Sequence, residues 1–166
     1  MKLQANGTAI EQVIHQKLLG VTIDQELTFK EHVDKLCKKL SKKIGLLKKL
    51  CTYLPTEERL LFYDALIKPV MMYGSIVWTY CSKEDLMRVF RLQKHAACVI
   101  LGTGIRSRTV ENFKKLNWIP FYDEVKIRKC LLIYKALHGE SPTYIESSLT
   151  IITPCMVERP GMASII

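Results

Sequence analysis

One periodic segment constrains the fold of this chain more than any other feature. Between Phe29 and Cys51, apolar residues recur at helical spacing within an arc of about 100°. They are Val33, Leu36, Cys37, Leu40, Ile44 and Leu47. The opposite side carries five lysines, which are Lys35, Lys38, Lys39, Lys42 and Lys49. The pattern predicts an amphipathic helix with one face in a core and an outer face made almost entirely of lysine.

Signals for helix boundaries mark further helices along the chain. Thr28 and Glu31 have the spacing of a capping box at the start of the lysine-rich helix. Pro55 opens a second helix through "RLLFYDALI", which is apolar on almost every side and is therefore expected to be buried. Pro69 is expected to break or kink that helix. Three more helices are expected over 82–101, 109–117 and 120–138.

Only the beginning of the chain has the pattern of β-structure. The stretch "AIEQVIHQKLLGVTID" contains short apolar runs and the β-branched residues Val21, Thr22 and Ile23. We expect strands near Ala9–Val13 and Lys17–Ile23 to pair as a hairpin. The predicted fold class is therefore mainly α, a helical bundle preceded by a short β-hairpin, with an irregular tail.

The charge of the chain narrows the classes of partner. With 166 residues, 48% of them hydrophobic, the chain can bury a core, and its formal net charge is +9. A protein this basic is a candidate for binding nucleic acid or an anionic surface, although a basic protein can also lack such a partner. The longest uncharged stretch, "PVMMYGSIVWTYCS", is shorter than the roughly 20 residues that span a bilayer. No membrane partner is therefore expected.

No catalytic or metal-binding pattern assembles in the sequence. The six cysteines, Cys37, Cys51, Cys81, Cys98, Cys130 and Cys155, lie far apart without a CxxC pair, which indicates reduced thiols in an intracellular protein. There is no P-loop, GxSxG or HExxH motif. We therefore expect no catalytic residue, no metal ligand and no cofactor in this chain. The choice between nucleus and cytoplasm stays open.

Four segments in order carry a resemblance to a known family. They are "KLLGVTIDQELTFKEHVDKLCKKLSKKIGLLKKL", "LLFYDALIKPVMMYGSIVW", "RLQKHAACVILG" and "LLIYKALHGESPTYI". Together they cover roughly 16–145, and the series resembles the reverse transcriptase of jockey-like, LINE-type non-LTR retrotransposons. The resemblance implies the end of the polymerase, where the thumb and a helical connector follow the palm.

The resemblance also implies a division of the chain and roles for some residues. Residues 1–28 would be a hairpin at the palm edge, 29–81 a thumb-like bundle, 82–146 the connector and 147–166 a tail. Leu18, Leu19, Gly20 and Val21 would correspond to the hairpin that holds the primer terminus, whereas the residues alone indicate only a strand with a glycine at a bend. The lysine face would contact the phosphates of an RNA–DNA hybrid without reading sequence.

The family's catalytic carboxylates have no counterpart here. The sequence contains no Asp-Asp pair, and the family's motif would lie N-terminal of this chain, where its aspartates bind the Mg²⁺ ions of the intact polymerase. We therefore expect a truncated copy or fragment that cannot polymerise alone. Its partners would be the missing palm and fingers and a template–primer.

Two other functions fit the same residues. One is an autonomous basic helical module that binds nucleic acid through phosphates. The other is a helical protein–protein interaction domain that uses its apolar faces. Salt-dependent binding to duplexes would favour the first, and a defined dimer without affinity for nucleic acid would favour the second.

Overall fold

The structure is a computed structural model that describes residues 4–5, 8–9, 13–104 and 107–147. The chain divides into two compact units, Met1–Lys129 and Cys130–Ile166. The described part is mainly α-helical with short antiparallel hairpins at its beginning, so the predicted fold class is confirmed. The four-part division at 28, 81 and 146 stays a prediction, and the predicted tail lies almost wholly outside the described residues.

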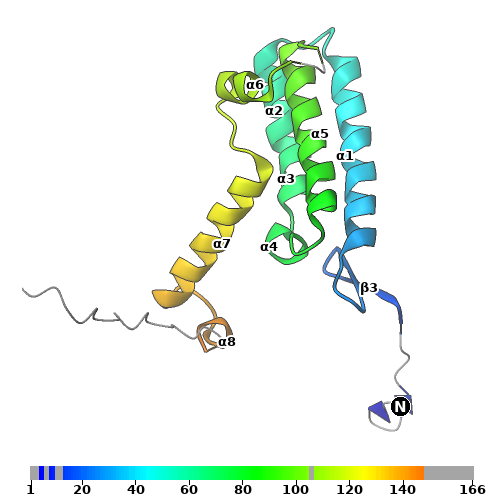
Figure 1. Ribbon diagram of the computed structural model, residues 1–166, viewed down its shortest axis with the longest axis vertical. Helices are drawn as coiled ribbons and strands as arrows, with labels where there is room; N and C mark the ends of the chain where they lie inside the picture. Colours follow the sequence, from blue (N-terminus) through cyan, green and yellow to red (C-terminus); the bar gives the residue numbers. More distant parts are fainter. Residues whose placement is uncertain (1–3, 6–7, 10–12, 105–106, 148–166) are drawn as a thin grey trace, which may run out of the picture. The chain divides into compact units, whose positions relative to one another are not determined.

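The first unit contains most of the helices (Figure 1). Its longest helices are α1 (Lys30–Leu50) and α5 (Lys83–Leu101). Between them in sequence come α2 (Thr56–Phe62), a π-helical turn η1 (Tyr63–Ile67), α3 (Lys68–Met72) and α4 (Ser75–Trp78). After α5 follow α6 (Thr109–Leu116) and the start of α7 (Phe121–Leu137). In the second unit, α8 (Thr143–Glu146) follows the end of α7.

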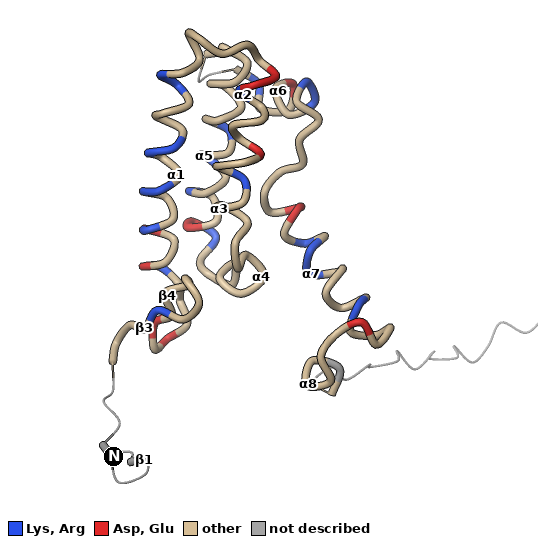
Figure 2. The backbone as a smooth tube through the Cα atoms, turned by 180° about the vertical axis from the view of Figure 1, so that it is seen from behind, with Lys and Arg blue, Asp and Glu red and all other residues tan. Residues whose placement is uncertain are grey.

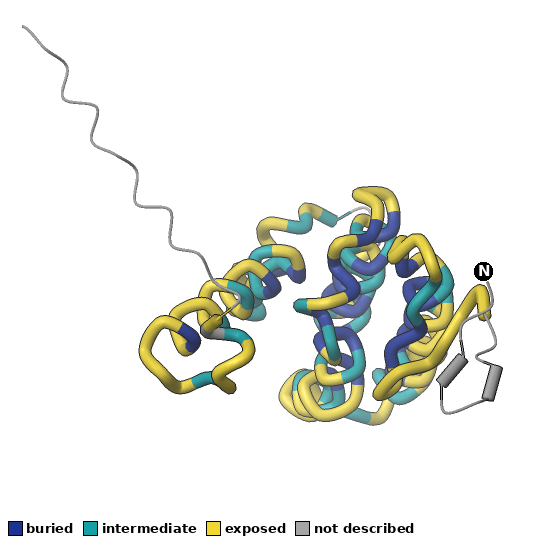
Figure 3. The backbone as a smooth tube through the Cα atoms, turned by 90° about the horizontal axis from the view of Figure 1, so that it is seen from below, coloured by how far each residue is buried: buried dark blue, intermediate teal, exposed yellow. Residues whose placement is uncertain are grey.

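The apolar stripe predicted for α1 lies in the core. Of its members, only Cys37 is half-buried, and the other five are buried. They pack with buried residues of α5, η1 and α3, including Val89, Ala96, Tyr63, Ile67 and Met71. Figure 3 shows the buried segments gathered toward the middle of this bundle and the exposed segments outside. The helical period of the sequence therefore predicted the buried face of α1 correctly.

Helices α1 and α5 lie side by side and run in the same direction (Figure 1). Near their starts, the Arg88 guanidinium lies 2.6 Å from a carboxylate oxygen of Asp34. Near their ends, the Cys51 thiol donates a hydrogen bond to the carbonyl of Val99, at 3.4 Å. The segment α2–η1–α3 returns in the opposite direction and closes the bundle.

The helical segment through "RLLFYDALI" is less buried than predicted. None of the residues of α2 is fully buried, and Leu61 is exposed at 68%. Leu60 and Phe62 pack partly against the core, and Tyr63 and Ile67 of the following turn are buried in it. The prediction of a buried helix was wrong because only one side of this segment faces α1 and α5. The π-helical turn lies just before Pro69, whose missing N–H and bulky ring disturb regular α-helical bonding.

The β-hairpin of the described residues differs from the predicted one. Its strands are β3 (His15–Leu18) and β4 (Val21–Asp24), paired antiparallel with Leu18 opposite Val21. Leu19 and Gly20 form the turn, with φ angles of 45° and 86°, as in the two-residue turns that favour hairpins. The prediction of one strand over Lys17–Ile23 was wrong because the chain reverses at these two residues. Of the predicted strand Ala9–Val13, residues 10–12 lie outside the described part.

Two very short strands precede this hairpin, β1 (Gln4–Ala5) and β2 (Thr8–Ala9), which pair with each other.

Among the described residues, none of the helices has the length and apolar content needed to cross a membrane.

The predicted capping box at Thr28 and Glu31 is not formed. The carboxylate of Asp24, at the end of β4, instead accepts hydrogen bonds from the backbone N–H groups of Thr28 (2.9 Å) and Phe29 (2.7 Å). Glu31 binds Lys35 and His15. The structure departs from the motif because Leu27 and Phe29 both have positive φ angles, 56° each, which turn the chain sharply into α1. Asp24 thus fixes the hairpin to the first turn of the helix.

The other predicted boundaries agree with the structure. Ser82 caps α5, its hydroxyl accepting a hydrogen bond from the N–H of Asp85 at 3.1 Å. Gly102 ends the same helix with a φ angle of 65°, and the N–H of Thr103 reaches back to the carbonyl of Cys98. Helices α6 and α7 lie within a residue or two of their predicted ranges.

Arg59 of α2 joins the ends of three segments. Its guanidinium group donates hydrogen bonds to the carbonyls of Leu54 (2.7 Å), Ile100 (2.9 Å) and Cys51 (2.6 Å). Cys51 and Ile100 lie at the carboxyl ends of α1 and α5, where backbone carbonyls lack partners within the helix. A cation at this place also compensates the partial negative charge of both helix ends.

We predict that Arg59→Met lowers the free energy of unfolding by about 2 kcal/mol, because three carbonyls lose a charged hydrogen-bond donor. Urea denaturation followed by circular dichroism measures the change. The matched control is Arg91→Met on α5, whose side chain is exposed. Equal effects of the two substitutions would contradict the role of Arg59.

Candidate nucleic-acid interface

All five lysines predicted on the outer side of α1 are exposed. Figure 2 shows lysine and arginine segments repeating along α1 on the side turned away from α3 and α5. We call Lys35, Lys38, Lys39, Lys42 and Lys49 the lysine face. The helical period places them together because residues three and four apart share one side of a helix.

The two carboxylates of α1 leave most of the lysine face uncompensated. Glu31 lies 2.7 Å from the Nζ of Lys35, which also contacts the hydroxyl of Thr22. Asp34 is turned to Arg88 of α5 instead. The other four lysines have no carboxylate partner within the part of the chain that the structure describes. The result is a row of positive charge with little local neutralisation, which is the arrangement that attracts phosphates.

The four residues of the predicted primer-holding hairpin lie together at its tip. Leu18 and Leu19 are exposed at 58% and 83%, Gly20 is exposed, and Val21 is buried. The phenol of Tyr73, just after α3, donates a hydrogen bond of 2.7 Å to the carbonyl of Leu19. A Cβ atom on Gly20 would lie 3.3 Å from the Tyr73 ring, and the φ angle of 86° is one that residues with side chains rarely adopt, so both the contact and the backbone favour glycine here. The tip is therefore fixed against α3 while its leucines stay exposed.

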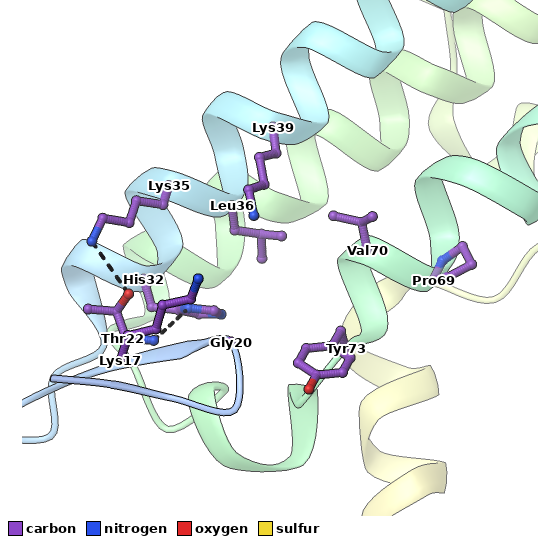
Figure 4. Close-up of a pocket in the computed structure, with 10 residues that line it drawn as sticks. All are labelled: Lys17, Gly20, Thr22, His32, Lys35, Leu36, Lys39, Pro69, Val70 and Tyr73. Carbon is purple, nitrogen blue, oxygen red and sulfur yellow. Dashed lines mark hydrogen bonds between the residues drawn. The ribbon is translucent and has the colours of Figure 1, made fainter.

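His32 connects the hairpin to the lysine face (Figure 4). Its Nδ1 accepts a hydrogen bond of 3.2 Å from the N–H of Thr22 in β4, and its ring lies 5.7 Å from that of Trp78. Burial, with added contributions from Lys39 and Lys35, lowers the pKa of this imidazole. His32 is buried because the hairpin folds over this side of α1.

The sequence pattern did not predict the hydrogen bonds by which His32, Thr22 and Tyr73 hold the hairpin in this region. These residues are 10 to 54 positions away from their hydrogen-bond partners in the chain, so no local spacing relates them. The one available signal was Gly20, because a glycine beside apolar residues often marks a close approach of the backbone to another group.

The acidic and thiol groups do not assemble into a second kind of site. The described residues contain no group of three or more His, Cys, Asp or Glu side chains that could hold a metal ion. Asp85 accepts hydrogen bonds from Ser82 and Arg88, which accounts for its burial at the start of α5. Burial raises the pKa of Cys37, and it raises the pKa of Cys81 to about 11, so both thiols stay protonated at neutral pH. Cys155 lies outside the described residues.

Fold and surface together define a mainly α-helical, strongly basic chain with a row of exposed lysines. In sequence it is similar to the probable RNA-directed DNA polymerase from transposon X-element of Drosophila melanogaster, with 26% identity over 112 residues. It is also similar to the probable RNA-directed DNA polymerase from transposon BS of the same species, with 25% identity over 118 residues. The chain therefore contains a region related to the reverse transcriptases of non-LTR retrotransposons.

The matches cover 66% and 69% of this chain but only 12% and 13% of the two polymerases. The chain thus spans a small part of the length of these relatives. No family model matches the chain, and no solved structure matches it.

We predict that the stability of the fold declines as the pH falls below the ordinary histidine pKa of 6.5. Because the folded-state pKa of His32 is lowered, the unfolded chain binds this proton more readily, and protonation favours unfolding. The contribution is fully present above pH 6.5 and is lost below it. Hydrogen bonds to Asp24, chiefly from the Thr28 backbone, lower its carboxyl pKa, so that group adds a further loss only near and below pH 3.8.

Thermal melts between about pH 7.5 and pH 5.5 measure the decline assigned to His32. His32→Asn keeps an acceptor for Thr22 but does not titrate. The melting temperature of this variant should be lower at neutral pH and should change less with pH across this range. An undiminished slope in that variant would show that other groups cause the decline.

Proposed function

We propose that this chain is a template–primer-binding part of a reverse transcriptase, comprising its thumb and the helical connector behind it, without catalytic residues of its own. The observation that carries the proposal is the lysine face, a row of exposed and mostly unpaired lysines on a helix whose other side is buried. The relation to RNA-directed DNA polymerases supplies the nature of the polyanion, an RNA–DNA hybrid.

The chemistry of the lysine face suits a polymerase that moves along any sequence. An ammonium group neutralises a phosphate as a point charge and releases a counterion, and it reads no base. Because α1 is packed along its whole apolar side, the backbone positions that carry its lysines are fixed along one side of the helix. A rigid row of this kind can follow a phosphate backbone without folding on binding.

The hairpin tip supports the same function. We propose that Leu18, Leu19, Gly20 and Val21 contact the primer end, as the resemblance to the family implies. In support, the tip carries two exposed leucines and is fixed by Tyr73, so it can present an apolar edge at a constant position. The palm and fingers of the parent polymerase would supply the acidic residues that bind Mg²⁺.

We predict that the chain binds an RNA–DNA hybrid without sequence preference, with a dissociation constant on the order of 10⁻⁴ to 10⁻⁶ M near physiological salt. If about four phosphates are contacted, the logarithm of the association constant should fall with the logarithm of salt concentration at a slope of about −3 to −4. Fluorescence anisotropy across a salt series measures both quantities.

Replacing Lys38, Lys42 and Lys49 with Gln should flatten this slope by about two to three units, one for each lost phosphate contact. The fold should persist because these side chains are exposed. The matched control removes the same charge from other helices, at the exposed Lys83, Lys114 and Lys115. If both triple variants lose the same slope, the attraction is diffuse, and the lysine face has no special role.

We predict that the isolated chain extends no primer on an RNA template in the presence of Mg²⁺ and nucleotides. The physical reason is the lack of an Asp-Asp pair to hold the two metal ions. Incorporation of labelled nucleotide, measured on purified protein, tests this directly. Sustained incorporation that survives further purification would contradict the proposed non-catalytic role.

One observation favours a second candidate function, protein–protein interaction. In the second unit, the end of α7 exposes several large apolar side chains, namely Leu131, Ile133, Tyr134 and Leu137. Exposed apolar groups in one helix commonly mark a contact with another protein. A defined dimer in light scattering, together with no affinity for the hybrid, would favour this function over the first.

A further inference from the structure

A groove lies between the hairpin, α1 and the end of α3 (Figure 4). Its volume is about 660 Å³, within the range of pockets that hold small organic ligands. Thr22 and His32, joined by their hydrogen bond, lie on one side of it. Tyr73 and Val70 lie on the other.

The charge lining the groove is entirely positive. Lys17, Lys35 and Lys39 line it, and none of its lining residues is acidic. Lys35 is engaged with Glu31 and Thr22, whereas Lys17 and Lys39 have no ion pair with any residue in the described ranges. A groove of this kind attracts an anion and repels a cation.

The remaining wall is apolar and contains an aromatic ring. Leu36, Pro69 and Val70 contribute aliphatic surface, and Tyr73 contributes its phenol ring. The ring is held in place at its hydroxyl by the carbonyl of Leu19, and its edge lies close to Gly20. A fixed aromatic ring beside aliphatic side chains suits a flat, weakly polar group.

Lys39 belongs both to this groove and to the lysine face. A phosphate backbone that follows α1 therefore arrives at the groove without leaving the row of positive charge. An anion that also carries a flat ring, and that is already attached to such a backbone, is a nucleotide. This continuity favours a nucleotide over a free apolar anion.

We infer that the groove binds one unpaired nucleotide of a strand whose paired part lies along the lysine face. Its base packs against Tyr73 and Val70, and its phosphate lies between Lys17 and Lys39. The inference rests on the proposed function and adds to it a preference for hybrids with a single-stranded extension. Paired bases do not enter, because a base must leave its stack to lie against the ring.

The test compares two labelled probes in fluorescence anisotropy, a blunt RNA–DNA hybrid and the same hybrid with two unpaired nucleotides at one end. The extension should raise the affinity of the intact chain about tenfold, an effect typical of one base stacked on an aromatic side chain. Both orientations of the extension are measured, since either strand end can enter the groove. Equal affinity for blunt and extended hybrids would overturn the inference.

Val70→Trp fills the groove and should abolish the gain from the extension while leaving the affinity for the blunt hybrid unchanged. The matched control is Val110→Trp, the same substitution at an exposed position on α6 outside the groove. A gain that persists in Val70→Trp would also overturn the inference. Circular dichroism establishes that each variant is folded.

Lys17→Gln provides a second variant that cannot disturb the core, because Lys17 is exposed in β3. It should reduce the gain several-fold and leave blunt binding within about twofold, because the lysine face keeps its phosphate contacts. If the extension no longer raises the affinity while the blunt hybrid binds normally, the inference is supported. If the extension raises the affinity as much as before, the phosphate does not lie between Lys17 and Lys39. If the extended hybrid binds through the groove but the blunt hybrid does not bind, the proposed function fails and the groove remains a site for a nucleotide.

Discussion

The arrangement of the first unit depends on one guanidinium group. Helices α1 and α5 run in the same direction, so their carboxyl ends, with their unpaired carbonyls and partial negative charge, lie side by side. Arg59, entering from the antiparallel α2, donates to the carbonyls of Cys51 and Ile100 at these ends. With both helix ends satisfied, the apolar stripe of α1 can pack along α5, and the lysine face is directed outward.

A second constraint fixes the hairpin at the other end of α1. Asp24 closes the sharp turn after β4 by accepting hydrogen bonds from three backbone N–H groups and one hydroxyl. The hairpin then folds over the first turns of α1, where Thr22 meets His32, and its tip reaches Tyr73. The groove exists because these two hydrogen bonds hold the hairpin across the space between α1 and α3.

The surface of this unit combines two kinds of chemistry on adjoining elements. The lysine face is an exposed row of positive charge, which suits the phosphate backbone of a nucleic acid of any sequence. The groove offers shape, an aromatic ring and two unpaired lysines, which suits a single nucleotide. Both belong to a chain that contains a region related to the reverse transcriptases of non-LTR retrotransposons.

The sequence by itself determined the helices, the buried side of α1, the exposed lysines and most helix ends, because periodicity and caps act between residues a few positions apart. The sequence did not show that the chain reverses at Leu19 and Gly20, because these residues lie inside a run with the pattern of one strand. It also did not show that "RLLFYDALI", which is apolar on almost every side, is only partly buried. Only the tertiary structure decided that Asp24 caps the approach to α1, that Arg59 serves two helix ends and that His32 is covered. Those contacts join residues that are distant in the chain or held at unusual φ angles, and such contacts form only when the elements pack.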